Sequence, residues 1–92
     1  MNVLQKTTVS CVTLKERSVQ CQGLSLKYRL NVICEAHDTH YEVEAALDGK
    51  ECARATVGGD IEIALTLFDA ICQGTVTPCA LTEIIDEMRI GI

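Results

Sequence analysis

Two histidines near the middle of the chain form the local cluster best suited to metal chemistry. His37 and His40 lie three residues apart between two apolar segments, and Cys34 comes shortly before them. Imidazole and thiolate are ligands that transition metals use in proteins, so His37, His40 and Cys34 are candidate metal ligands. The same residue types are common in a solvated hairpin loop, and the sequence favours this simpler interpretation.

The six cysteines lack the Cys-x-x-Cys spacing of zinc ribbons and thioredoxin-type redox sites. Cys34 and Cys72 fall on the apolar faces of predicted elements, where free cysteine acts as a small hydrophobe. Cys79 differs because it follows Pro78 in the first turn of a predicted helix, where unpaired amides and the helix dipole favour a thiolate. Cys79 is therefore the candidate reactive thiol, weighed against an ordinary place at a helix start.

Carboxylates are grouped on two predicted polar faces. Glu42 and Glu44 share one side of a strand, and Glu83, Asp86 and Glu87 share one side of a helix. Such pairs can act as general acid and base, but a chain this short has little room for a water-excluding pocket. Phosphate-loop, nucleophile-elbow and zinc-protease motifs are also missing from the sequence. The sequence thus predicts no catalytic residue and no cofactor.

Alternation of apolar and polar residues predicts the strands that position these side chains. The pattern is clearest over 24–34 and recurs over 41–47. A connection of about five residues between them would pair Glu35 with His40. Asp48-Gly49 predicts a tight hairpin to a third strand over 51–57, whose register the pattern leaves open unless a bulge lies near the turn.

The first quarter of the chain is less regular. Residues 7–14 are rich in β-branched types and carry no charge, which predicts another strand. Residues 15–18 are polar and predict a turn, and Gly23 predicts a bend or bulge before the long alternating strand.

Helical spacing replaces alternation after residue 57. Asp60 is an N-cap candidate for a helix that ends at Gly74. The predicted apolar stripe of this helix consists of Ile61, Ala64, Leu65, Phe68, Ile71 and Cys72. Thr77-Pro78 predicts the start of a second helix that ends near Ile90. The sequence therefore predicts a single α+β domain over 1–92, an antiparallel sheet of about four strands followed by two C-terminal helices packed on one face.

Several short segments resemble a known pattern. They are Tyr28-Arg29-Leu30, Tyr41-Glu42-Val43-Glu44, the helix start from Asp60 to Phe68, Val76-Thr77-Pro78 leading to Leu81, and Ile85-Asp86-Glu87. Over about residues 24–89 the chain resembles an uncharacterised family, a domain of unknown function in small proteins of spore-forming Gram-positive bacteria. The resemblance implies a bacterial source and carries over no catalytic residue.

Charge and composition narrow the partners. A net charge of −5 opposes binding to nucleic acid or anionic lipid, and the three aromatic residues offer few stacking platforms. The sequence shows neither a signal-peptide pattern nor an apolar run long enough to cross a bilayer. We therefore expect a cytoplasmic protein in which the cysteines stay reduced, with no nucleic-acid or membrane partner.

Three functional classes remain open on this basis. The sequence favours a small non-enzymatic protein-interaction or regulatory module that has a protein partner and forms a homodimer, because uncovered sheet edges invite pairing. The second class is a metal- or redox-responsive protein that uses His37, His40 and cysteines. The third is an enzyme acting on a small molecule.

Overall fold

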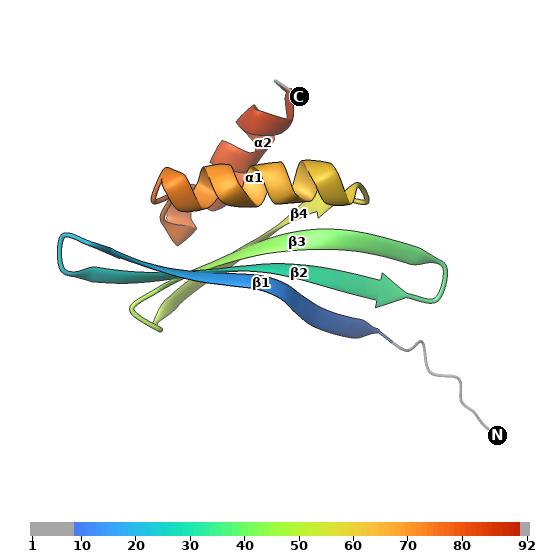
Figure 1. Ribbon diagram of the computed structural model, residues 1–92, viewed down its shortest axis with the longest axis horizontal. Helices are drawn as coiled ribbons and strands as arrows, with labels where there is room; N and C mark the ends of the chain where they lie inside the picture. Colours follow the sequence, from blue (N-terminus) through green and yellow to red (C-terminus); the bar gives the residue numbers. More distant parts are fainter. Residues whose placement is uncertain (1–8, 91–92) are drawn as a thin grey trace.

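The fold is an antiparallel meander followed by two helices, and the computed structural model describes residues 9–90 of it. The strands are β1 (Ser10–Cys21), β2 (Leu24–Glu35), β3 (Asp38–Leu47) and β4 (Glu51–Gly58), and they lie in the sheet in chain order. The helical segments are α1 (Ile61–Gln73), a 3₁₀ turn η1 (Pro78–Ala80) and α2 (Leu81–Ile90). Both helices lie on the same side of the sheet (Figure 1). The predicted α+β architecture is confirmed.

The core fills the space between the sheet and the helices. Alternate residues of β2 and β3, such as Tyr28, Leu30 and Val43, are fully buried and face Phe68 and the other buried residues of the helical layer. The predicted place of Phe68 in the core is confirmed. The predicted stripe of α1 is shifted at its start, since Ile61 is 37% exposed while Leu67 is buried.

Local sequence signals set the start and the end of α1. The side chain of Asp60 accepts hydrogen bonds from the backbone N–H groups of Glu62, at 2.9 Å, and Ile63, at 3.3 Å. These bonds satisfy two of the amides that a helix start leaves unpaired, so the predicted N-cap is confirmed. Gly74 follows the last turn, and its N–H donates to the Ala70 carbonyl at 2.9 Å.

The β2–β3 hairpin corrects a predicted register, and the β3–β4 hairpin has a register that the sequence left open. Glu35 pairs with Asp38, so only Ala36 and His37 lie in the β2–β3 turn and the predicted pairing of Glu35 with His40 is wrong. The shorter turn adds backbone pairs to the ladder and leaves fewer N–H and C=O groups without a partner. Three residues, 48–50, connect β3 to β4, and Asp48 and Gly49 have positive φ angles of 52° and 70°. The turn is one residue longer than a two-residue hairpin, and this extra residue is the irregularity that the sequence analysis expected near the turn.

β1 departs most from the sequence analysis. The strand runs unbroken through residues 15–18, where a turn was predicted, and Gln22-Gly23 makes the turn instead. A bulge at Leu14 shifts the register, so Lys15 and Arg17 change sides and face the helices. Their cationic groups lie 5.9 and 5.7 Å from the centre of the Phe68 ring. Residues 7 and 8 of the predicted strand lie outside the described residues.

Within residues 9–90, neither helix has the length and apolar character needed to cross a bilayer.

Candidate functional site

Within residues 9–90, one surface of the sheet has no helix on it, and its central residues form a row of alternating charge. We call this surface the open face. In register across the four strands stand Glu16 of β1, Arg29 of β2, Glu44 of β3 and Arg54 of β4. Arg29 Nε donates to Glu16 at 2.8 Å, and Arg29 Nη1 lies 3.9 Å from a Glu44 oxygen. The row thus alternates negative and positive from one edge of the sheet to the other.

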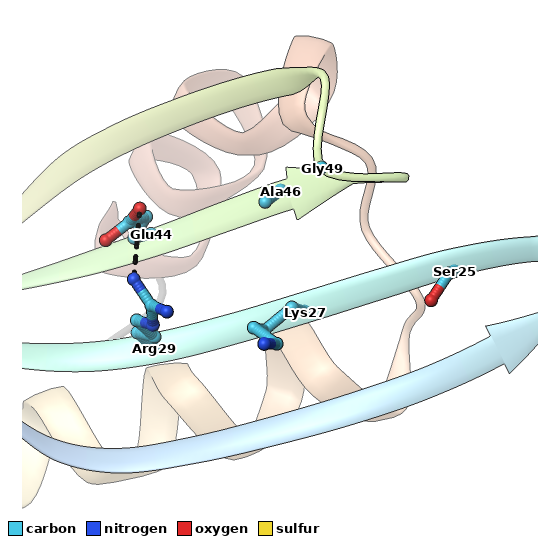
Figure 2. A pocket seen from close by; sticks show the side chains of 6 residues that line it. All are labelled: Ser25, Lys27, Arg29, Glu44, Ala46 and Gly49. Carbon is cyan, nitrogen blue, oxygen red and sulfur yellow. Dashed lines mark ion pairs between the residues drawn. The ribbon is translucent and has the colours of Figure 1, made fainter.

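A shallow hollow of about 320 Å³ lies beside this row. Figure 2 looks onto the open face, with the helices behind the sheet, and shows Arg29, Lys27 and Glu44 around the hollow. Ser25, Ala46 and Gly49 complete its lining. The lining combines cationic, anionic and small residues on an open surface. Such a surface suits contact with another chain better than enclosure of a small molecule.

Asn31 lies beside the charged row, on the side of the β2–β3 turn, and adds hydrogen bonds to it. Its side chain is only 3% exposed although it points away from the helices. Asn31 Oδ1 accepts a hydrogen bond from the Thr13 hydroxyl at 2.8 Å, and Nδ2 donates to Glu42 at 3.4 Å and to Glu44 at 3.3 Å. A buried amide with satisfied donors and acceptor holds β1, β2 and β3 in one register.

Charges in and beside the row lower the pKa of Glu16 and raise the pKa of Cys52. The hydrogen bond from Arg29, with the nearby Lys27 charge, lowers the pKa of Glu16 and keeps it ionised. Cys52 on β4 instead donates its S–H to Glu44 Oε2 at 3.3 Å. Burial raises the pKa of the Cys52 thiol, and the Glu44 carboxylate raises it further. Cys52 is therefore held as a thiol, the less reactive form.

We expect Cys52 to react slowly with iodoacetamide at pH 8, and the variant Glu44→Gln to make the same thiol react severalfold faster. Removing the carboxylate charge lowers the cost of forming the thiolate. Peptide mass spectrometry of timed alkylation would give the rate at Cys52, with Cys11 of the same molecules as the internal reference. Equal Cys52 rates in the parent and the variant would contradict this account.

The structure does not gather the predicted metal ligands into one group. His37 lies exposed in the turn, and Cys34 is exposed and stands opposite Thr39 in the sheet register. His40 is half-buried in β3, and its Nδ1 lies 3.0 Å from Oδ2 of the exposed Asp38. Among the described residues, no three His, Cys, Asp or Glu side chains are arranged to hold a metal ion. Metal binding by His37, His40 and Cys34 stays a prediction.

Replacing both His37 and His40 with alanine should change the free energy of unfolding by less than about 0.5 kcal/mol, because His37 is exposed in the turn and the half-buried His40 contacts the exposed Asp38 carboxylate. Thermal unfolding with and without EDTA measures the effect. A fall of several degrees that EDTA reproduces in the parent protein would instead establish a structural metal.

The cysteines occupy more exposed positions than the sequence analysis expected. Cys72 is buried, at 4% exposure, but Cys34 is exposed because the end of the sheet extends past α1. Burial also raises the pKa of the Cys72 thiol. Cys79 lies exposed in η1, before α2 begins, with its sulfur 3.5 Å from the Thr77 hydroxyl. Its reactivity stays a prediction.

Two residues of the charged row were missed from the sequence. Residues 15–18 predict a turn at Glu16. The predicted pairing of Glu35 with His40 implies that Arg29 stands opposite Ala46, whereas the structure places Arg29 opposite Glu44. The absence of Gly, Pro, Asn and Asp from residues 15 to 21 is the signal in the sequence that β1 extends through Glu16.

These observations define the molecule as an α+β protein with a four-stranded meander, a helical layer on one face and a charged open face on the other. No protein-family model matches the chain, and comparisons with curated proteins and with solved structures also give no match.

Proposed function

We propose that this protein is a non-enzymatic interaction module that binds a partner protein through its open face. The observation that carries the proposal is the row Glu16–Arg29–Glu44–Arg54, which crosses all four strands on a surface without helices. Charged groups arranged in a fixed pattern select a partner by electrostatic complementarity more than they add affinity. The neighbouring hollow gives the surface a shape that a partner side chain can fill.

The proposal includes a bacterial, cytoplasmic setting and a two-fold homodimer. All six cysteines are free, which supports a reducing compartment. The bacterial source rests on the family resemblance alone. The long, exposed β1 edge supports self-association.

The test is cross-linked affinity capture from the native cell with three baits: the parent protein, Arg54→Glu and Lys50→Glu. Both variants reverse one exposed positive charge, but Arg54 stands in the charged row and Lys50 lies in the β3–β4 turn. Proteins captured by the parent and by Lys50→Glu, but lost with Arg54→Glu, would support the proposal. Identical captured sets for all three baits would contradict it.

Elemental analysis of the purified protein separates this proposal from the metal-responsive alternative. Stoichiometric zinc would favour the alternative and would direct attention to His37 and His40.

A further inference from the structure

The two edges of the sheet differ in how well they are protected from pairing with another strand. β4 is eight residues long, its register shifts near Val57, and both η1 and α2 pack against it. β1 is twelve residues long, and ten of these residues are exposed. Short strands, bulges and covering segments are the devices by which proteins block edge pairing. β4 has the bulge and the covering segments, so within residues 9–90 β1 is the edge more open to a partner.

Protection is also uneven along β1 itself. From Leu14 onward the strand carries the bulge and the charged residues Lys15, Glu16 and Arg17. Residues 9–13 have neither a charge nor an irregularity. Three of the five large hydrophobic side chains that are exposed within residues 9–90 belong to Val9, Val12 and Leu14. An uncharged, apolar and regular edge segment is the surface that strand pairing requires.

We propose that two copies of the chain pair antiparallel through residues 9–13 of their β1 segments, with the two-fold axis beside Cys11. This inference rests on the homodimer of the proposed function and adds its interface and register. The two sheets then form one continuous sheet of eight strands, with both helical layers on the same side.

Charge and geometry select this register. An axis at Lys15, Glu16 or Arg17 would place identical charges directly opposite one another, which destabilises a strand pair. An axis at Val12 or beyond would bring the bulge at Leu14 into the pairing. An axis at Cys11 places Val9 opposite Thr13 of the second copy and Ser10 opposite its Val12, so every described pair is uncharged.

Repulsion between the α2 helices of the two copies is weak at this edge. Residues 60–89 contain six acidic residues and one basic residue, Arg89, so the net charge of −5 of the chain resides in this segment. Within it, α2 packs against β4 at the opposite edge of the sheet. Three strand spacings, about 14 Å, separate β4 from β1, so the negative charge of α2 in the two copies stays more than a Debye length apart.

The size of the interface sets its expected strength. Five paired residues from each copy bury less than the roughly 1,000 Å² that marks a stable interface. The dimer should therefore form at micromolar concentrations and dissociate on dilution.

The experiment is light scattering after size exclusion in reducing buffer, over about 1 to 500 µM protein. The mass of the parent should rise from 10.0 kDa toward twice that value with concentration. Val12→Lys should remain at 10.0 kDa. Thr56→Lys adds the same charge at an exposed position of β4 and should behave like the parent. Circular dichroism checks that both variants keep the parent fold.

A second measurement tests the register. In variants that retain one cysteine, oxidised glutathione should cross-link the Cys11 protein into a dimer much faster than the Cys34 protein, because Cys34 is also exposed but lies on β2, away from the axis. A constant 10.0 kDa mass for the reduced parent would overturn both the homodimer and this interface. A dimer that tolerates Val12→Lys, or one without faster cross-linking at Cys11, would overturn the interface and leave the homodimer standing.

Discussion

Phe68→Ala is expected to lower the free energy of unfolding by about 3–5 kcal/mol. Phe68 is the only phenylalanine in the chain and is fully buried between α1 and the sheet. Its ring also supports the cationic groups of Lys15 and Arg17, which lie over it from β1. Both ion-pair with Asp69, the next residue, so losing the ring leaves a cavity beneath the whole cluster. A small domain has only about 5–15 kcal/mol of total stability, so part of the population should unfold at 37 °C.

Urea unfolding followed by circular dichroism measures this loss, and Ile61→Ala in the same helix is the control. Ile61 is 37% exposed, so its truncation removes far less buried surface and should cost under about 1.5 kcal/mol. A Phe68→Ala protein as stable as the Ile61→Ala protein would show that the core does not depend on this ring.

We also expect the protein to lose stability above pH 10 because Tyr28 is buried. Tyr28 is fully buried, and its hydroxyl donates to the Val76 carbonyl at 2.8 Å, which joins β2 to the segment between the helices. Burial, with smaller contributions from Cys72 and Cys21, raises the pKa of Tyr28 to about 12 from 10. The folded protein therefore holds this proton where the unfolded chain loses it. The contribution of Tyr28 ionisation to the free energy of unfolding is therefore negligible below pH 10. As the pH rises toward 12, this ionisation lowers the free energy of unfolding by at most about 2–3 kcal/mol.

Parallel urea titrations of the parent and Tyr28→Phe from pH 8 to pH 12 isolate this effect from the titration of lysines. At pH 8 the variant should be less stable by about 1–2 kcal/mol, because the half-buried Val76 carbonyl loses its donor. The difference between the two proteins should then shrink as the pH rises. A constant difference across the range would mean that Tyr28 does not couple its ionisation to unfolding.

The parts of the fold that sequence predicted well are those where a local signal and the tertiary structure agree. The even positions of β2 are apolar because the helices cover that side, so alternation alone identified Leu26, Tyr28 and Leu30. Asp60 combines a capping side chain with preceding glycines, and both act within one turn of the helix. These features need no knowledge of distant residues.

The errors arise where a single residue changes the phase of the pattern. Leu14 is the extra residue in β1, and after it the inward positions change from even to odd numbers. Lys15 and Arg17 consequently point toward the core side, where an alternation analysis expects apolar residues. Their charges are tolerated there because Asp69 and the Phe68 ring lie within reach. That compensation comes from a helix more than fifty residues away, so the local sequence could not reveal it.

The candidate site was less predictable than the fold for a similar reason. The charged row depends on the registers of three strand pairs, and a one- or two-residue error in any pair separates its members. Arg29 and Glu44 were recognised as polar residues on neighbouring strands. Their alignment with Glu16 and Arg54 became apparent only with the turn lengths. By contrast, His37 and His40 are close in sequence, but the hairpin does not bring them together with a third metal-ligating side chain among the described residues.

The order of the elements along the chain also determines how long the core surface is exposed during synthesis. Each strand pairs with the previous one across a turn of two or three residues, so the meander can form as soon as β4 has left the ribosome. The helices that cover its apolar side are made only afterwards, over residues 61–90. At about 5–20 residues per second, this interval lasts a few seconds. The nascent sheet therefore presents Leu26, Tyr28 and Leu30 to solvent throughout that time, and we expect this intermediate to be the form that needs chaperone protection.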